Sequence, residues 1–142
     1  MCLFRFFIVF AALPFSVSLW AQGLTGATSQ HEPSPMQQTS DGSYVIKTTS
    51  LSKDVKGFKG TTPLTITVKN DTVVSIKPLR NRETPEYFLQ AQEMLKAWEG
   101  LPVSDALALQ VDAITGATLS CEALRENVRL GLTYYQQHRA TQ

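Results

Sequence analysis

Two short β-rich stretches joined by a turn dipeptide place the strongest constraint on how this chain can fold. The stretches are Leu64–Lys69 and Val73–Leu79, and apolar and polar side chains alternate along the first of them. Such alternation is expected of an antiparallel strand with one buried face. Asn70 and Asp71, which lie between the stretches, tolerate the left-handed backbone of a tight hairpin turn. The sequence therefore predicts an antiparallel hairpin.

Further elements are expected on both sides of this hairpin. Ser43–Thr49 predicts another strand, and Ser50–Gly60, which contains three lysines and two glycines, predicts a loop. A helix is expected to begin at Thr84-Pro85, with Thr84 as the N-cap, and to end at Gly100. Its apolar residues recur at helical spacing: Tyr87, Phe88, Ala91, Leu95 and Trp98.

Leu109–Ala113 is a candidate short strand, and a last helix is expected from about Ser120 to Gln137. The buried stripe of this helix is predicted to be Leu124, Val128, Leu132 and Tyr135. The fold class predicted from these elements is α+β: a small, largely antiparallel sheet with two main helices packed on it, in a single domain.

The N-terminal 21 residues have the pattern of a secretory signal peptide. Arg5 is their only charge, Phe6–Leu13 is apolar, and Ala21 gives a small residue at a plausible cleavage point. An uncleaved membrane anchor is the rival interpretation, but Phe6–Ala21 is shorter than the roughly 20 residues that span a bilayer. The sequence therefore favours an exported, periplasmic or extracytoplasmic protein, with anchoring by an uncleaved segment as the alternative.

The remaining chain is expected to contain one folded domain. Residues 22–42 are rich in Gln, Ser, Thr and Pro and predict a flexible leader. Residues 43–137 form the expected domain, and residues 138–142 a C-terminal tail. The whole chain has 13 basic and 12 acidic residues, so cleavage after residue 21 leaves a formally neutral protein. This charge balance argues against nucleic acid as a partner.

A motif immediately before the last helix carries the clearest chemical signal. Residues 112–120 read D-x-x-T-G-A-T-x-S. A helix N-terminus favours a phosphate through its exposed N–H groups and its dipole. A threonine hydroxyl at this place can touch a phosphate or be joined to one.

The motif resembles the flavinylation motif D-x-x-[ST]-G-A-[ST] of the FMN-binding domain family. That family includes peripheral subunits of the Na+-translocating NADH:quinone reductase and of Rnf-type electron-transport complexes. In the family, a flavin transferase takes FMN from FAD and esterifies its phosphate to the last Thr or Ser of the motif. Asp112, Thr115, Gly116 and Ala117 match the restricted positions, so the resemblance implies Thr118 as the acceptor.

Two other segments support the resemblance, which covers roughly Tyr44 to Tyr135. Gly57–Gly60 and the E-T-P sequence at Glu83–Pro85 occur in the family's order. The resemblance implies that Glu83 and Thr84 line a flavin pocket, although an acidic residue at a helix start is also stabilised simply by the helix dipole. The family often continues E-T-P with Gly-Leu-Gly, and Glu86-Tyr87-Phe88 departs from that pattern.

The chain also contains a second T-G-A-T sequence, at Thr25–Thr28. Three residues before it stands Gln22 rather than an acid, and Pro33 and Pro35 follow in place of an amphipathic helix. We interpret this repeat as coincidental, and we do not expect a flavin on Thr28.

The resemblance implies an exported flavoprotein that carries FMN covalently on Thr118 and transfers electrons. It also implies a flavin transferase as maturation partner and redox partners in the membrane or outside the cytoplasm. A non-covalent FMN-binding or sensory module is the alternative, and a small reductase acting on its own substrate is a weaker one. Cys121 lies at a helix N-terminus, a place that invites a redox or nucleophilic role, but without a Cys-x-x-Cys partner the sequence assigns no catalytic residue. His31 and His138 suggest no metal site.

Overall fold

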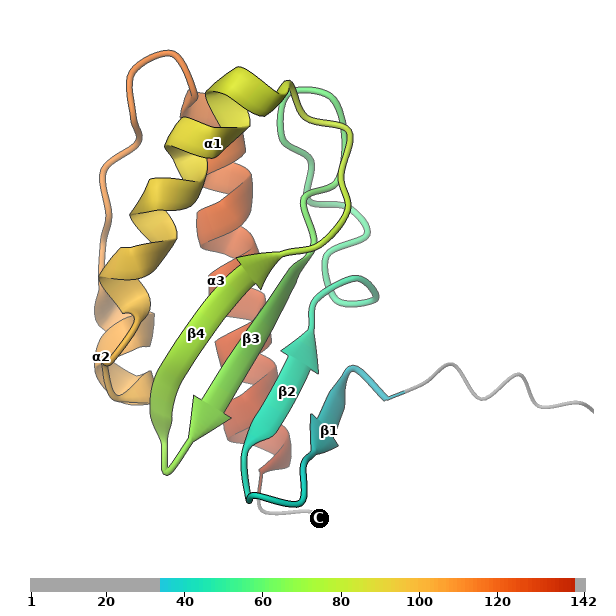
Figure 1. Ribbon diagram of the computed structural model, residues 1–142, viewed down its shortest axis with the longest axis vertical. Helices are drawn as coiled ribbons and strands as arrows, with labels where there is room; N and C mark the ends of the chain where they lie inside the picture. The colour runs from blue at the N-terminus through green and yellow to red at the C-terminus, as the bar shows by residue number, and fades with distance from the viewer. Residues whose placement is uncertain (1–33, 140–142) are drawn as a thin grey trace, which may run out of the picture. The chain divides into compact units, whose positions relative to one another are not determined.

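The protein forms a four-stranded antiparallel sheet with helices packed against it (Figure 1). The structure, a computed structural model, describes residues 34–139. Its strands follow one another in the order β1-β2-β3-β4. The strands are β1 (Met36–Gln38), β2 (Tyr44–Lys47), β3 (Leu64–Lys69) and β4 (Thr72–Pro78). The helices are α1 (Pro85–Glu93), the 3-10 helix η1 (Met94–Trp98), α2 (Val103–Ala108) and α3 (Thr118–His138). This architecture confirms the predicted α+β class.

The predicted hairpin is present as β3 and β4. Asn70 and Asp71 have φ angles of 49° and 57°, so both residues of the turn adopt the expected left-handed conformation. The register is regular on either side of an irregularity between Thr67 and Val68. Alternate residues of β3 are fully buried, because one face of the strand packs on the core.

The strand β1 corrects the expectation of a flexible leader for the last part of residues 22–42. Met36 pairs with Ile46 of β2, and its side chain is only 1% exposed. The reversal between the two strands contains Gly42, whose φ of 79° suits glycine. The other two residues of this short strand are glutamines, so neither its length nor its composition predicts a strand. Residues 1–33, which include the expected signal peptide and Thr25–Thr28, lie outside the described residues.

The first expected helix is present in two parts. Pro85 begins α1 after Thr84, whose side chain makes no capping hydrogen bond. The helix tightens into η1 at Met94, and Gly100, with a φ of 82°, follows its end. A further short helix, α2, was not predicted, since its six residues carry no clear helical stripe. The indole Nε1 of Trp98 donates to the carbonyl of Ala106 at 3.0 Å and ties η1 to α2.

The prediction of a strand at Leu109–Ala113 is wrong. This segment is irregular, and the outer edge of β4 is already occupied by residues 99–102. There the N–H of Val73 donates to the carbonyl of Leu101, and the N–H of Ile76 donates to the carboxylate of Glu99. A sheet edge covered in this way has no place for another strand.

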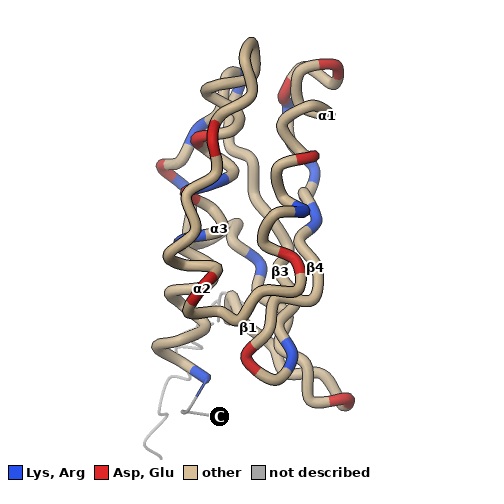
Figure 2. The backbone as a smooth tube through the Cα atoms, turned by 90° about the vertical axis from the view of Figure 1, so that its left-hand side faces the viewer, with Lys and Arg blue, Asp and Glu red and all other residues tan. Residues whose placement is uncertain are grey.

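The helix α3 forms a second layer beside the sheet (Figures 1 and 2). It packs on β2 and β3, whereas α2 and η1 pack against β4. Its predicted stripe, Leu124, Val128, Leu132 and Tyr135, is buried. The helix begins at Thr118, two residues before the expected start. Within residues 34–139, no helix is long and apolar enough to span a bilayer.

Candidate functional site

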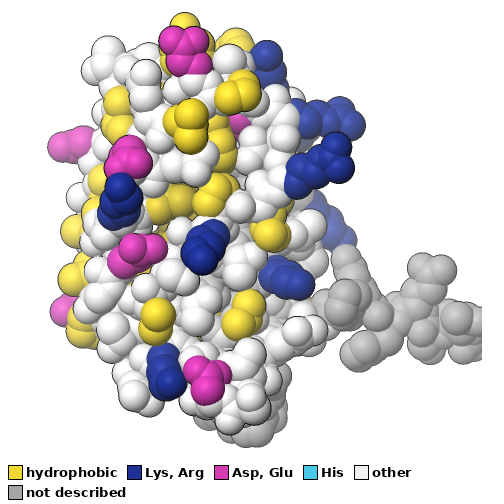
Figure 3. Space-filling view, in the orientation of Figure 1, with side chains coloured by type: hydrophobic (Ala, Val, Ile, Leu, Met, Phe, Trp, Pro, Cys, Tyr) yellow, Lys and Arg dark blue, Asp and Glu magenta, His cyan; other side chains and the backbone are white. Residues whose placement is uncertain are grey.

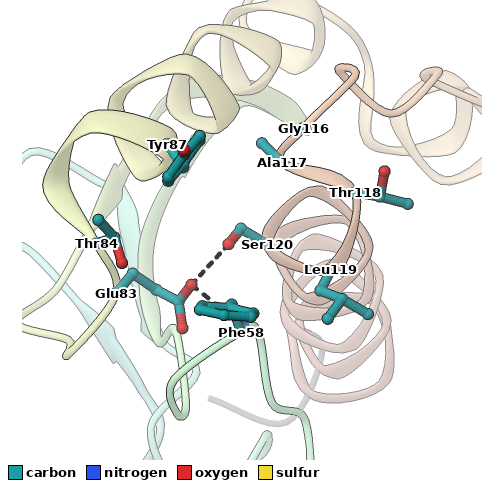
Figure 4. A pocket seen from close by; sticks show the side chains of 9 residues that line it. All are labelled: Phe58, Glu83, Thr84, Tyr87, Gly116, Ala117, Thr118, Leu119 and Ser120. Atoms are coloured by element: carbon teal, nitrogen blue, oxygen red, sulfur yellow. Dashed lines mark hydrogen bonds between the residues drawn. The ribbon is translucent and has the colours of Figure 1, made fainter.

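A pocket of about 490 Å³ lies at the N-terminal end of α3 (Figure 4). Three segments that are distant in the sequence form it: the loop around Phe58, the start of α1, and the motif turn with the first residues of α3. Its lining residues are Phe58, Glu83, Thr84, Tyr87, Gly116, Ala117, Thr118, Leu119 and Ser120. The pocket therefore unites the three segments on which the family resemblance rests.

Glu83 holds these three segments together. Its Oε1 accepts the N–H groups of Lys59 at 2.7 Å and Gly60 at 3.2 Å. Its Oε2 accepts the N–H of Phe58 at 3.1 Å and the hydroxyl of Ser120 at 2.6 Å. The side chain is 7% exposed. One buried carboxylate thus bridges the loop, the start of α1 and the start of α3.

The environment of Glu83 keeps it ionised at neutral pH. Burial on its own raises the pKa of the carboxyl, but the hydroxyl of Ser120 and the N–H groups of Lys59, Phe58 and Gly60 together outweigh burial and lower the pKa. Because four donors already occupy its oxygens, Glu83 acts as a structural acceptor and is not a poised acid or base.

Gly57 allows the loop to approach this carboxylate closely. A Cβ atom at residue 57 would lie 2.9 Å from Oε1 of Glu83 and 3.0 Å from its Cδ. The N–H of Gly57 donates to the carbonyl of Gly60 at 2.8 Å, so the segment is also a tight turn. This turn lies at the end of the loop that the sequence predicts over Ser50–Gly60. It places Phe58 in the pocket wall.

The motif forms a fixed turn into α3. Gly116 has a φ of 88°, and the N–H of Ala117 donates to the carbonyl of Ile114 at 3.0 Å. The N–H of Ile114 in turn donates to Sγ of Cys121 at 3.4 Å, so this fully buried thiol fastens the turn to the helix. The first turn of α3 presents its N–H groups without intrahelical carbonyl partners, beside the pocket. This helix end suits an anion.

The motif residues do not all lie in the pocket. Thr118 is exposed at the rim, and in Figure 4 its side chain points away from Glu83 and Ser120. Gly116 and Ala117 form part of the wall. Asp112 and Thr115 are exposed residues of the turn and are not among the lining residues. The structure therefore brings together Thr118, Gly116, Ala117, Glu83 and Thr84 but not Asp112 or Thr115.

Sequence reasoning assigned no specific site role to four lining residues: Phe58, Tyr87, Leu119 and Ser120. Tyr87 is one of the apolar residues that recur at helical spacing in the first expected helix, but its side chain is 49% exposed and faces the pocket (Figure 4). Phe58 and Leu119 are also well exposed, at 68% and 52%. Large apolar side chains left exposed around a pocket are a recognised sign of a binding site. In the sequence, the one sign that Tyr87 could have a role at the site was its departure from the Gly-Leu-Gly pattern that often follows E-T-P in the family.

The pocket fits FMN in size and chemistry. Binding sites for cofactors of this size typically measure about 300–1,000 Å³ and have mainly apolar walls. Aromatic and aliphatic side chains provide such walls here, and the start of α3 provides N–H groups for a phosphate. Among the residues that the structure describes, no group of His, Cys, Asp and Glu side chains could hold a metal ion.

Comparison with known proteins agrees with this fit. The family model described as FMN-binding domain matches residues 57–133, which include every lining residue of the pocket. Searches among curated proteins and among solved structures found no match. The matched region covers more than half of the chain and contains the loop, the start of α1 and the motif. The chain belongs to the FMN-binding domain family, and FMN is its cofactor.

Proposed function

We propose that this protein is an exported electron carrier whose FMN is bound covalently through a phosphoester to Thr118. The observation that carries the proposal is the position of Thr118. It is the last residue of the D-x-x-T-G-A-T sequence, the first residue of α3, and an exposed residue at the rim of the pocket. A hydroxyl at this position is open to a modifying enzyme and adjacent to the N–H groups that suit the ester phosphate.

The proposed maturation reaction is a transfer from FAD by a flavin transferase. The Oγ of Thr118 forms a bond to the phosphorus on the FMN side, and the pyrophosphate bond of FAD breaks. AMP leaves, and the threonine hydroxyl gives up its proton. The transferase and the protein must meet in the same compartment, which we propose to be outside the cytoplasm.

The charge of the pocket supports a covalent link. The nine lining residues include no Lys, Arg or His, and their one ionisable acid, Glu83, is negative at neutral pH. Within the lining, the one source of positive potential for a free FMN phosphate is therefore the α3 N-terminus, and a helix end contributes only about 0.3–1 kcal/mol at an exposed site. Esterification retains the cofactor without a cationic phosphate site.

The walls of the pocket support an electron-transfer role. Phe58 and Tyr87 provide aromatic surfaces for a flavin ring, and both are exposed to solvent on one side. The flavin supplies one- and two-electron chemistry, while the protein fixes its position and its access. A ring held in an open pocket remains within reach of a redox partner in the membrane or outside the cytoplasm.

Substitution of the acceptor tests the proposal. The protein and its Thr118→Ala, Thr118→Ser and Thr28→Ala variants are co-expressed with an exported flavin transferase, and flavin fluorescence is measured on denaturing gels. We expect fluorescence to be lost in Thr118→Ala and retained in part in Thr118→Ser, because serine keeps the nucleophilic oxygen. Thr28→Ala, which removes the last threonine of the second T-G-A-T sequence, is the control and should keep its flavin.

A fluorescent band in the Thr118→Ala variant would contradict the assigned acceptor. Flavin that is absent from every denatured band but present in the folded wild-type protein would favour a non-covalent FMN-binding or sensory module instead.

A further inference from the structure

Charged residues are unevenly distributed along the folded domain. Residues 47–82, which contain β3, β4 and the loops at their ends, carry eight Lys or Arg and two Asp. Residues 83–139, which contain the helices, carry four Lys or Arg and eight Asp or Glu. A nearly neutral protein thus has a basic part and an acidic part, and such an asymmetry orients the approach of a charged partner.

Part of the basic region forms a face beside the pocket. We define the basic face by Lys56 and Lys59 in the loop, and by Arg80 and Arg82 in the segment before α1. All four side chains are exposed. The two segments lie side by side because Glu83, next to Arg82, accepts the N–H of Lys59. In Figure 3, Lys and Arg side chains gather at the upper right, over these loops.

The cations of the basic face are available for an external partner. The ion pairs found within residues 34–139 involve other cations: Lys69 with Asp41, Lys96 with Glu93, Arg129 with Glu126, and Arg139 with Asp71. The four cations of the basic face therefore have no acidic side-chain partner in the described part of the chain. Desolvating them against carboxylates of another molecule would break no ion pair.

The basic face also borders the pocket and is held in place. Phe58 lies between Gly57 and Lys59 in the sequence and lines the pocket. Three consecutive N–H groups of this loop bind the buried carboxylate of Glu83. The backbone that carries Lys59 is therefore held next to the cofactor site, so a partner bound there would need little reordering of the loop.

From these observations we propose that the basic face is the docking surface for a redox partner protein whose own redox centre lies within an acidic surface. This inference rests on the proposed electron-carrier function. Complementary charges around the two centres steer the encounter and bring the partner to the open side of the pocket. Residues 83–139, which contain the helices, carry a net negative charge. They therefore repel an acidic partner and disfavour docking through that side of the protein.

A protein fits the basic face better than an anionic membrane. Peripheral membrane binding usually combines basic residues with an apolar helix face or several inserted side chains. Here the face consists of two loop segments, and Phe58, the large exposed apolar residue next to it, also lines the pocket. A membrane on this surface would cover the opening through which a partner reaches the flavin.

The test is a titration that needs no bound flavin. ¹⁵N-labelled protein is titrated at low ionic strength with an acidic [2Fe–2S] ferredoxin, with a basic c-type cytochrome, and with phosphatidylglycerol–phosphatidylcholine vesicles. Amide resonances of residues 56–60 and 79–83 should shift or broaden with the ferredoxin and not with the cytochrome. The affinity should fall at least about tenfold when salt is raised to physiological ionic strength.

A matched pair of variants separates the basic face from net charge. In one variant Lys56, Lys59, Arg80 and Arg82 are replaced by Gln, and in the other Lys69, Lys96, Arg129 and Arg139 are replaced by Gln. Both lose four positive charges, but only the first alters the basic face. We expect the first variant to bind the ferredoxin at least about tenfold more weakly than the second.

Equal losses in the two variants, perturbed resonances confined to segments away from both the basic face and the pocket, or tighter binding to the vesicles than to the ferredoxin would each overturn the proposal. Because the titration uses unflavinylated protein, its failure is distinct from a failure of Thr118 to carry flavin.

Discussion

Glu83 is the residue on which the geometry of the pocket depends. Its two oxygens accept three N–H groups of the loop 58–60 and the hydroxyl of Ser120. Hydrogen bonds to a charged group each contribute about 1.5–3 kcal/mol, and a buried donor left without a partner costs about 1–3 kcal/mol. The sequence identified Glu83 as a pocket residue, but only the fold shows that it binds the loop.

Replacing this carboxylate should loosen the pocket. Glu83→Gln exchanges one acceptor oxygen for an NH₂ donor that faces donors of the loop, so we expect the free energy of unfolding to fall by about 2–3 kcal/mol. Urea denaturation measures the change. Glu86→Gln, at an exposed position nearby, is the control and should change stability by less than about 0.5 kcal/mol.

The pH dependence of stability gives a second test of the same residue. The pKa of Glu83 is lowered in the folded protein, so its contribution is present above the unfolded pKa of about 4.3 and is lost as the pH falls through the folded pKa. Wild type should therefore lose stability below about pH 4.3 more steeply than Glu83→Gln. Parallel pH profiles of the two proteins would contradict the assigned ionisation.

Gly57 is the second residue whose identity the pocket requires. In Gly57→Ala the new Cβ would press on the carboxylate of Glu83 at 2.9 Å, whereas a Cβ at Gly60 meets no atom within 4 Å. We expect Gly57→Ala to lower the free energy of unfolding by about 1–3 kcal/mol and Gly60→Ala to leave it nearly unchanged. Equal unfolding midpoints for the two variants would show that the loop does not depend on this close approach.

At the scale of elements, the packing of α3 on the sheet depends on a glycine inside the helix. A Cβ at Gly131 would lie 2.6 Å from Cδ1 of Ile66 and 3.1 Å from Cγ2 of Thr48. Helix propensity alone favours alanine at this position by about 1 kcal/mol. The contact with a fully buried side chain of β3 opposes that gain.

We therefore expect Gly131→Ala to destabilise the protein by about 1–2 kcal/mol despite its better helix propensity. Removing the contacted methyl group in the double variant Gly131→Ala/Ile66→Val should recover part of the loss, and a double-mutant cycle with Ile66→Val alone measures the coupling. A stabilised Gly131→Ala variant would mean that α3 moves away from the sheet at little cost.

The elements that could be predicted from sequence are those with a strong local pattern. The hairpin has alternation and a turn dipeptide, and α3 has a long apolar stripe, so both were found. The strand β1 and the helix α2 are short and exist through contacts with β2, η1 and β4. The segment Leu109–Ala113 has strand composition, but the β4 edge that it would need is occupied by residues 99–102.

At the scale of the whole molecule, the site forms where three distant segments meet. The motif at 112–118 could be found from sequence because its residue types are restricted. The orientation of Tyr87 and the bond between Ser120 and Glu83 could not, since both depend on how α1 and α3 are placed by the core. Asp112 and Thr115 belong to the motif pattern yet lie outside the pocket lining, where they are exposed and accessible to the proposed flavin transferase.

The most direct test of the central claim is the intact mass of the protein after co-expression with an exported flavin transferase, denaturation and desalting. A covalent carrier should gain the mass of FMN minus one water, and peptide mapping should place the gain on Thr118. The second T-G-A-T sequence, at Thr25–Thr28, is an internal control and should remain unmodified. An unmodified mass, or a flavin mapped to another residue, would contradict the account.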